Sequence, residues 1–300
     1  MSRKHLVVIA GPTAVGKTAV AINLAQHFHT EIISADSRQC YRELVIGVAR
    51  PSSSELASVP HHFIASHSIH EEVNAAVFEQ YALQKLQSVF IKNDVAIVCG
   101  GTGLYLDALM YGLDAVPPVA DAVRQAVRTG YETHGLAWLQ QQLQEADADA
   151  YATIDVHNPH RLMRALEVVR STGRSIKSFH QTKKLRTEFE VHPFLLQLPK
   201  EVLHSRIHQR VEDMMQARLL EEVRCLLPWE HLAPLQTVGY TELFAHLHGQ
   251  TDLTTAVEKI KTATRQYAKR QLTWFTRNAL YGAVPPEENP ILKHLSSKIA

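Results

Sequence analysis

One octapeptide near the start of the chain constrains its fold more than any other feature. Gly11-Pro12-Thr13-Ala14-Val15-Gly16-Lys17-Thr18 has the spacing G-x4-G-K-[ST] of a phosphate-binding loop. Its glycines allow a tight turn in which backbone N–H groups point at phosphate oxygens, while the lysine adds a charge and the threonine hydroxyl can ligate Mg²⁺. The apolar run His5 to Ala10 predicts a buried strand before the loop, and Gly16 to Phe28 predicts a helix whose N-terminus favours anions. The sequence therefore predicts a phosphate site at residues 11–18.

Alternating strands and helices fill the first third of the chain. We predict further strands over Glu31–Ala35 and Val95–Cys99, and helices over Ala75–Ile91 and Leu104–Tyr111. This order is typical of an α/β fold with a parallel sheet, in which ligands bind to loops at the carboxyl ends of the strands.

The middle of the chain shows no strand pattern. After a break at Val116-Pro117-Pro118 the pattern is helical from Asp121 to about Gln181, and Phe194–Leu198 then predicts a return to the sheet. We therefore predict a helical insertion, residues 117–190, within a core made of residues 1–116 and 191–300. The core is expected to end in long helices over three segments: Glu201–Leu227, Tyr240–Leu247 and Leu253 to about Tyr281.

Composition excludes several classes of protein. The formal net charge of +1 argues against an overall basic coat, so any nucleic-acid binding must come from local patches. The three cysteines, Cys40, Cys99 and Cys225, are far apart, which indicates neither a disulfide framework nor a zinc site. The eighteen histidines are scattered, and surface or packing roles are favoured even for the pair His61-His62. No segment is long enough to span a bilayer, and we expect a cytoplasmic protein with no membrane partner.

A local basic segment lies in the last predicted helix. From Lys259 to Pro286 there are six Lys or Arg residues and no acidic residue. The rings of Tyr267, Trp274 and Phe275 could stack on bases there. The alternative is an amphipathic helix whose aromatic rings pack into the core while its Lys and Arg are solvated. The pattern alone leaves both open.

One carboxylate stands at the end of a predicted strand near the phosphate loop. The strand Val95–Cys99 ends in Gly-Gly-Thr, where an Mg²⁺-binding acid is common in phosphate-loop enzymes. Asp36 follows Glu31–Ala35 instead. It could hold a metal ion through water or act as a general base, or Asp36 or Ser37 could cap the next helix.

Seven blocks of sequence together resemble the tRNA dimethylallyltransferase family, also called the isopentenyl-tRNA transferases. They follow the order expected of that family over nearly the whole chain. The blocks are GPTAVGKT, ISADSRQCY (Ile33 to Tyr41), His61-His62 after Pro60, GGTGLY (Gly100 to Tyr105), NPHRLMRALEV (Asn158 to Val168), TVGY (Thr237 to Tyr240) and TRQYAKRQLTWF (Thr264 to Phe275).

The resemblance implies a fold and a reaction. The fold is a P-loop NTPase-like parallel sheet with an inserted helical subdomain and C-terminal helices. The loop would hold the diphosphate of dimethylallyl diphosphate, and the dimethylallyl group would pass to N6 of the adenosine just 3′ of a tRNA anticodon. Diphosphate leaves with help from Mg²⁺. The expected partners are the tRNA anticodon stem-loop and dimethylallyl diphosphate, and we expect a monomer.

The resemblance also assigns residues by motif. Asp36 matches the family's base, Thr102 a threonine beside the reactive centre, and Lys17 with Thr18 the diphosphate and metal ligands. The expected tRNA contacts are Asp36, Ser37, Arg38, Gln39, Thr102, Arg124, His160, Arg161, Arg164, Lys269, Arg270 and Gln271. The chain departs from the family at Val45-Ile-Gly-Val-Ala-Arg-Pro51, where D-I-G-T-A-K-P is usual, and at His160 and Glu43.

Three other functions stay open on the residues alone. They are prenylation of free adenine nucleotides, phosphoryl transfer by a small-molecule kinase, and RNA binding without catalysis. The helical insertion and the basic helix argue against the first, because a mononucleotide needs neither.

Overall fold

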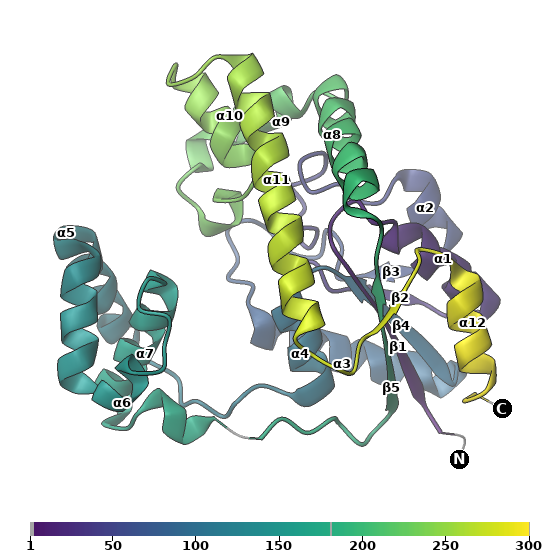
Figure 1. The fold of residues 1–300 in the computed structure, drawn as a ribbon, viewed down its shortest axis with the longest axis horizontal. Helices are drawn as coiled ribbons and strands as arrows, with labels where there is room; N and C mark the ends of the chain where they lie inside the picture. Colours follow the sequence, from purple (N-terminus) through teal and green to yellow (C-terminus); the bar gives the residue numbers. More distant parts are fainter. Residues whose placement is uncertain (1–2, 181, 300) are drawn as a thin grey trace. The chain divides into compact units, whose positions relative to one another are not determined.

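A parallel sheet forms the centre of the larger part of the chain (Figure 1). The computed structural model describes residues 3–180 and 182–299. Within these residues the sheet has six strands in the order β3-β2-β4-β1-β5-β6, and neighbouring strands pair in parallel. In chain order the strands are β1 (His5–Ala10), β2 (Ile32–Ser34), β3 (His61–His62), β4 (Val95–Gly100), β5 (Glu190–Leu196) and β6 (Gly282–Val284).

Helices cover both faces of the sheet, because the central strands are apolar on both sides. All residues of β1 and β4 are buried. Leu6 and Val8 of β1 face one hydrophobic cluster, while Val7 and Ile9 face the other. The first cluster includes residues of α3 (Ala75–Lys92) and α4 (Gly103–Tyr111), and the second includes residues of α1 (Lys17–His27) and α12 (Glu288–Ser296).

A group of helices extends beyond the carboxyl ends of the strands (Figure 1). It consists of α8 (Lys200–Gln216), α9 (Leu219–Leu226), α10 (Tyr240–Leu247) and α11 (Leu253–Thr276). The long helix α11 packs against α8, α10 and α4. The short helix α2 (Ser53–Ser58) precedes β3 and begins with a capping box between Ser52 and Glu55.

The second compact unit is helical. Contacts divide the chain into Met1–Gly112 with Leu185–Ala300, and Leu113–Lys184, whereas the sequence placed the boundaries at 117 and 190. The smaller unit contains α5 (Asp121–Ala146), α6 (Ala148–Tyr151) and α7 (Pro159–Thr172), and α5 bends at Gly135, which has a φ of 76°. Its own core includes Val127, Leu139 and Leu166. Gln181, the expected end of the helical segment, lies outside the described residues.

Most predicted elements of the sheet are confirmed, but one predicted helix is wrong. The segment Glu201–Leu227 is divided between α8 and α9 by Arg218, whose φ is +73°. Buried residues recur every four positions in α8, at Leu203, Ile207 and Val211. The same spacing of four, or a multiple of it, leads to the buried residues Leu219 and Val223 of α9. Four residues turn a straight helix by about 400°, so this spacing drifts off one face by about 40° per step. The break at Arg218 restores the apolar face to the core.

Other differences concern short elements and ends. Helix α11 stops at Thr276, five residues before the predicted end, and β5 starts at Glu190 instead of Phe194. The strands β3 and β6, with two and three residues, were not predicted, since so few residues give no periodic signal. Among the described residues, no helix is long and apolar enough to cross a membrane.

Candidate active site

The phosphate loop lies between the end of β1 and the start of α1. Helix α1 begins at Lys17, and its N-cap is Gly16, which has a φ of 110° and makes no side-chain cap. That backbone conformation favours glycine. The first N–H groups of a helix have no partner within it, so this N-terminus offers donors to an anion. In the structure, Lys17 Nζ donates to the carbonyl of Pro12 at 2.8 Å, which holds the ammonium over the loop.

The side-chain amide of Gln271, on α11, also holds the phosphate loop. Its Oε1 accepts from the backbone N–H of Thr13 at 2.8 Å, and its Nε2 donates to the carbonyl of Gly101 at 3.0 Å. Gln271 is only 6% exposed. A Cβ at Gly101 would lie 2.1 Å from Nε2, so a glycine is required for this approach. The amide of Gln271 therefore joins the loops that follow β1 and β4.

Two arginines of α8 also contact the loop. Arg210 donates to the hydroxyl of Thr13 at 3.0 Å, and Arg206 donates to the carbonyl of Val15 at 3.2 Å. The two residues stand four apart on one helix, which places them on the same face. Together with Lys17, these arginines place three basic side chains at this loop.

Burial changes the ionisation of groups around the loop. It lowers the pKa of Lys17 to about 8 and raises the pKa of the neighbouring Cys99 thiol to about 12. Burial also raises the pKa of Tyr267, whose ring lies in the same cavity. Cys99 and Tyr267 therefore stay neutral near pH 7, and the charge of Lys17 is sensitive to an anionic ligand.

Asp36 follows β2 and is held by the chain that comes after it. Its Oδ1 accepts from the backbone N–H groups of Arg38 at 2.9 Å and Gln39 at 3.2 Å. Its Oδ2 accepts no hydrogen bond from the described residues. Residues 37–40 form a turn and not a helix, so the helix cap considered from the sequence is wrong. One oxygen of Asp36 holds this turn, while the other is available for a proton or for a water on a metal ion.

Thr102 ties the loop after β4 to the segment after β2. Its Oγ1 accepts from the backbone N–H of Ser37 at 3.0 Å and lies 3.3 Å from the Ser37 hydroxyl. The N–H of Thr102 donates to the carbonyl of Ala35 at 3.1 Å. Thr102 thus positions the backbone on both sides of Asp36.

Two cavities meet at Asp36. The first, about 360 Å³, is lined by the predicted residues Thr13, Ala14, Gly16, Lys17, Thr18, Asp36, Gln39 and Gln271, together with Arg210 and Tyr267. The second, about 180 Å³, shares Thr13, Asp36, Arg210 and Tyr267, and adds apolar walls from Val211, Met214, Val238 and Ile260. A polar phosphate cavity therefore adjoins a more apolar one, with a carboxylate common to both.

The segment Val45–Pro51, where the chain departs from the family pattern, is held by a side chain that sequence reasoning missed. Glu222 of α9 accepts from the backbone N–H groups of Val45 at 3.3 Å, Ile46 at 2.8 Å and Gly47 at 3.1 Å. It also accepts from the hydroxyl of Tyr240 at 2.6 Å.

Further bonds hold the end of this segment. Gln39 Nε2 donates to the carbonyls of Val48 and Ala49, and Arg50 donates to those of Tyr41 and Arg42. These bonds fix residues that line both cavities. The substituted side chain of Val45 itself is 45% exposed.

The oxygen atoms in the first cavity fit a magnesium ion. The Thr18 hydroxyl and the Asp36 carboxylate line the same space as the N-terminus of α1. Mg²⁺ prefers oxygen ligands, keeps several waters and is commonly held by one or two protein groups together with substrate phosphates.

The residues expected to contact tRNA occupy several places. Arg38, Gln39 and Ser37 lie beside Asp36, and Lys269 and Arg270 are exposed on α11. Gln271 is buried between two loops and has both polar ends of its amide bonded within the protein. In the smaller unit, Arg124 lies on α5, and His160, Arg161 and Arg164 lie on α7. All are exposed except Arg164, which is half-buried.

The aromatic residues of α11 separate into three environments. Phe275 is fully buried in the core, so the interpretation that its ring stacks on a base is wrong. Trp274 is 38% exposed, and Tyr267 lines the cavities. Lys261 is paired with Glu212 and with Glu258, so it is not a free cation of the basic segment.

Arg206, Arg210 and Glu222 were not singled out from the sequence. The only local signal was the spacing of four residues between the two arginines within a predicted helix. Their contacts cross nearly two hundred residues of chain, so no local pattern identifies the partner.

Fold and site together define an α/β protein with a phosphate-binding loop, a carboxylate between two cavities and a helical insertion. Residues 39–278 match the model of the IPP transferase family. The chain belongs to that family.

Relatives of known name cover almost the whole chain. It is 44% identical to a tRNA dimethylallyltransferase of Cytophaga hutchinsonii over 92% of this chain and 91% of the relative. It is also 44% identical to a tRNA dimethylallyltransferase of Christiangramia forsetii over 98% of each.

Solved structures agree in fold. A full-length tRNA isopentenylpyrophosphate transferase of Bacillus halodurans superposes with a TM-score of 0.73 and 30% identity, covering 99% of this chain and 97% of the other. A eukaryotic dimethylallyltransferase described as acting on tRNA gives 0.80 and 25%, covering 98% of this chain and 77% of the other.

Proposed function

We propose that this protein transfers the dimethylallyl group from dimethylallyl diphosphate to N6 of the adenosine 3′-adjacent to a tRNA anticodon. The observation that carries the proposal is the position of Asp36, which lines both the cavity at the phosphate loop and the apolar cavity beside it. A group that accepts a proton at this junction stands between a leaving diphosphate and an incoming amine. The named relatives act on the same kind of substrate.

The phosphate loop would bind the diphosphate. As the bond between the allylic C1 and the bridging oxygen breaks, both electrons go to the diphosphate. The N–H groups at the start of α1, Lys17 and Arg210 surround the cavity in which that charge develops. Magnesium bound with Thr18 would neutralise further phosphate charge. The dimethylallyl chain fits the apolar walls supplied by Met214, Val238 and Ile260.

Asp36 would accept the proton from the amine. The lone pair of adenine N6 is delocalised into the ring, which makes it a poor nucleophile. As N6 bonds to C1, one of its two hydrogens passes to the free Oδ2 of Asp36, and the product is a neutral secondary amine. The acceptor base must leave the anticodon stack to enter this space. Ser37, Arg38, Gln39 and Thr102 surround the Asp36 segment and would face the flipped nucleotide.

Exposed and half-buried basic side chains would bind the rest of the anticodon stem-loop. We assign this role to Lys269 and Arg270 on α11, and to Arg124, His160, Arg161 and Arg164 in the helical insertion, residues 117–190. In the smaller unit, Glu167 lies near Arg124, Arg128 and Arg164. Burial raises the pKa of Glu167, and the charges of the three arginines partly offset this rise. Such a cluster of cations suits a phosphate backbone. Gln271 instead positions the phosphate loop.

The test is nucleoside mass spectrometry. Purified protein is incubated with unmodified tRNA, dimethylallyl diphosphate and Mg²⁺, and the digested nucleosides are analysed for isopentenyladenosine. The same mixture with AMP as acceptor tests the free-nucleotide alternative, and ATP with small-molecule acceptors tests the kinase alternative. Product on tRNA alone supports the proposal. Product on AMP but not on tRNA, or phosphoryl transfer from ATP, would replace it. Bound but unmodified tRNA would indicate an RNA-binding protein without catalysis.

Ligand protection provides a second test. Dimethylallyl diphosphate should raise the melting temperature more than ATP does, because a ligand of the native state stabilises it by mass action. We also propose that the protein acts as a monomer, which light scattering during gel filtration of the tRNA complex would check.

A further inference from the structure

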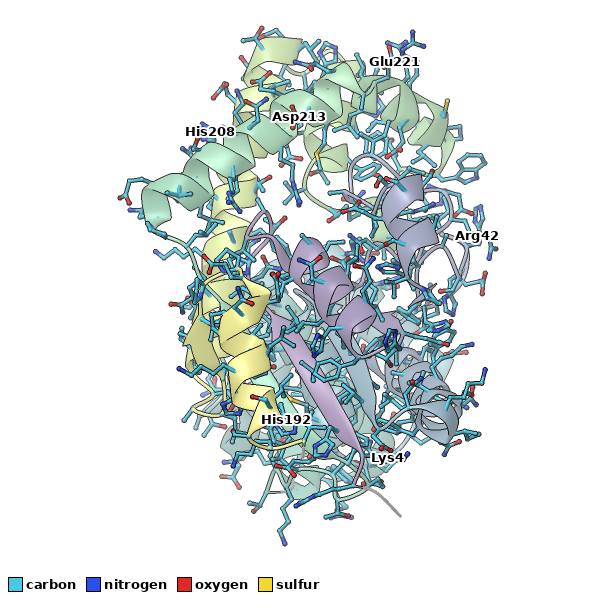
Figure 2. The ribbon with its side chains drawn as sticks, turned by 90° about the vertical axis from the view of Figure 1, so that its right-hand side faces the viewer. Lys4, Arg42, His192, His208, Asp213 and Glu221 are labelled. Carbon is cyan, nitrogen blue, oxygen red and sulfur yellow. The ribbon has the colours of Figure 1, made fainter. Side chains whose placement is uncertain are left out.

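A cluster of three possible metal ligands lies at the amino ends of the strands. His5 begins β1, and Glu190 and His192 lie on β5 next to it. Their ligand atoms, one from each residue, lie within 4.8 Å of one another. Figure 2 labels His192 at the foot of the sheet, near Lys4 and far from His208 and Asp213 at the helical end. The candidate active site is at the carboxyl ends of the strands, so it does not use this cluster.

The strand register brings the three side chains to one face of the sheet. His5 pairs with Glu190, and Val7 pairs with His192. Residues two apart in a strand point to the same side, so Glu190 and His192 project together beside His5. On this face Phe194 belongs to the hydrophobic cluster that contains residues of α12, and the rings of Phe194 and His294 pack edge to face with their centroids 5.4 Å apart. The cluster is therefore fixed by the fold and not by flexible loops.

The distance between the two histidine nitrogens is close to the separation of two ligand atoms around one ion. The facing nitrogens, His5 Nδ1 and His192 Nε2, are 3.0 Å apart. Two nitrogens bound tetrahedrally to zinc at about 2.0–2.1 Å lie roughly 3.3 Å from each other. A small increase in the distance between these two nitrogens would therefore let both bind one ion. His5 and His192 are 5% and 4% exposed, which keeps competing water from the two nitrogens.

We propose that His5, Glu190 and His192 form a binding site for a divalent transition metal ion of the zinc type. Two imidazoles and one carboxylate are a known ligand set for zinc, with a fourth position left for water. Glu190 reaches the ion by leaving Arg3, to which its Oε2 is bonded at 3.1 Å and whose side chain is 76% exposed. The ion would join the starts of β1 and β5. The alternative is an imidazole pair that shares one proton, beside a surface ion pair.

Zinc binding tests the proposal without using activity. Full-length protein stripped with a chelator is titrated with Zn²⁺ by calorimetry in excess Mg²⁺, which fills magnesium sites. Cys225 is an exposed thiol, so every variant carries Cys225→Ser. We expect one zinc per chain and a rise in melting temperature of about 5 °C at roughly a hundred times the dissociation constant. His192→Gln and Glu190→Gln should each lower the affinity by about 100-fold or more, since even an outer-shell partner is worth 10- to 100-fold.

The control is His248→Gln, which changes a histidine that contacts only one carboxylate, Glu230, at 2.7 Å. It should leave zinc binding unchanged. Cobalt(II) supplies a second readout, because a four-coordinate site gives visible absorption that both ligand variants should remove. If His192→Gln does not fold, as judged by circular dichroism, Glu190→Gln decides, because the Glu190 side chain is partly exposed at the amino end of β5. Failure of the parent protein to bind zinc below about 100 µM, or equal binding by parent and ligand variants, overturns the proposal.

Discussion

The side-chain amide of Gln271 accepts a hydrogen bond from the backbone N–H of Thr13 at 2.8 Å. These two residues are 258 positions apart, and the bond joins the carboxyl-terminal part of α11 to the phosphate loop. The same amide donates to Gly101 on the neighbouring loop. The helix assigned to tRNA binding thus also supports the site assigned to the diphosphate, so the two functions of α11 need separate variants.

We expect Gln271→Ala to weaken binding of dimethylallyl diphosphate and to lower stability. It leaves the N–H of Thr13 and the carbonyl of Gly101 without partners, at a cost of about 1–3 kcal/mol for each buried group. Calorimetry with dimethylallyl diphosphate and chemical denaturation measure the two effects. As a control, Arg270→Gln changes the adjacent exposed residue and should alter neither. If Gln271→Ala keeps normal diphosphate affinity but binds tRNA more weakly, Gln271 contacts tRNA as the sequence predicted.

Asp36→Asn should lower turnover by roughly 10² to 10⁴, as expected for loss of a general base, with little change in diphosphate affinity. Asn keeps an oxygen for the N–H groups of Arg38 and Gln39, so the local turn should survive. Single-turnover transfer to tRNA measures the chemical step. If Asp36 only caps the turn, turnover falls less than about threefold.

Sequence reasoning located the elements whose signals are local. The strand before Gly11, the helix after Gly16 and the carboxylate at Asp36 each depend on patterns within a few residues, and the structure brings the loop after that strand, the start of that helix and Asp36 to one cavity. The periodicity of α11 also predicted a helix. It could not decide whether the aromatic rings stack on bases or pack into the core, and the structure shows core packing for Phe275, which is fully buried.

The rest of the site depends on contacts between distant segments. Glu222 binds three N–H groups at Val45, Ile46 and Gly47, about 176 residues earlier in the chain. Neither its helix nor that loop contains a signal for the other. The cluster of His5 and His192 is equally non-local, because it depends on the register of β1 against β5. Such pairs become visible only when the sheet order and the helix packing are known.

Binding of dimethylallyl diphosphate should weaken above pH 8. Burial lowers the pKa of Lys17 to about 8 in the free protein, from 10.5 for an exposed lysine. The ligand prefers the protonated amine, so affinity should be nearly constant between about pH 7 and 7.5. It should then fall by up to about tenfold per pH unit as the free protein loses this proton. The ligand adds no such change, because the last ionisation of a phosphate ester is near pH 6.

The same shift has a consequence for stability. The charged amine is disfavoured in the fold, so below pH 8 the folded protein bears the cost of a buried charge. That cost is relieved as pH rises from about 8 to 10.5, so the free energy of unfolding should increase over this range.

Isothermal titration with dimethylallyl diphosphate between pH 7 and 9.5 measures the predicted change in affinity. Lys17→Arg stays charged throughout this range, so its affinity should show no decline, and an equal decline in both proteins would assign the titration to another group.

Glu222→Gln should loosen the segment Val45–Pro51. The carboxylate accepts three backbone N–H bonds and the hydroxyl of Tyr240, and bonds to a charged acceptor are worth about 1.5–3 kcal/mol each against about 1 for neutral ones. We expect a loss of about 1–3 kcal/mol in unfolding free energy and a higher KM for tRNA. Denaturation and steady-state kinetics measure these. Glu221→Gln, at the exposed neighbouring position labelled in Figure 2, is the matched control and should behave as the parent protein. Identical behaviour of the two variants would exclude a special role for Glu222.

The tRNA affinity should depend on salt through a few local contacts, since the formal net charge is only +1. Lys269 and Arg270 are exposed on α11. Each cation that meets a phosphate releases condensed counterions, and each such contact contributes about 0.7–0.9 to the slope of log affinity against log salt. Changing both residues to Gln should therefore reduce that slope by about one to two units and leave dimethylallyl diphosphate binding unchanged.

A second double variant, Lys92→Gln with Lys293→Gln, removes the same charge from exposed positions on α3 and α12. If the basic segment acts by position, this control keeps the slope of the parent protein. If general charge attraction is responsible, both double variants lower the affinity equally. Filter-binding titrations at several salt concentrations, with melting temperatures recorded for every variant, separate these cases. An unchanged slope in the first variant would remove α11 from the tRNA surface and leave Arg124, Arg161 and Arg164 of the helical insertion as the main contact.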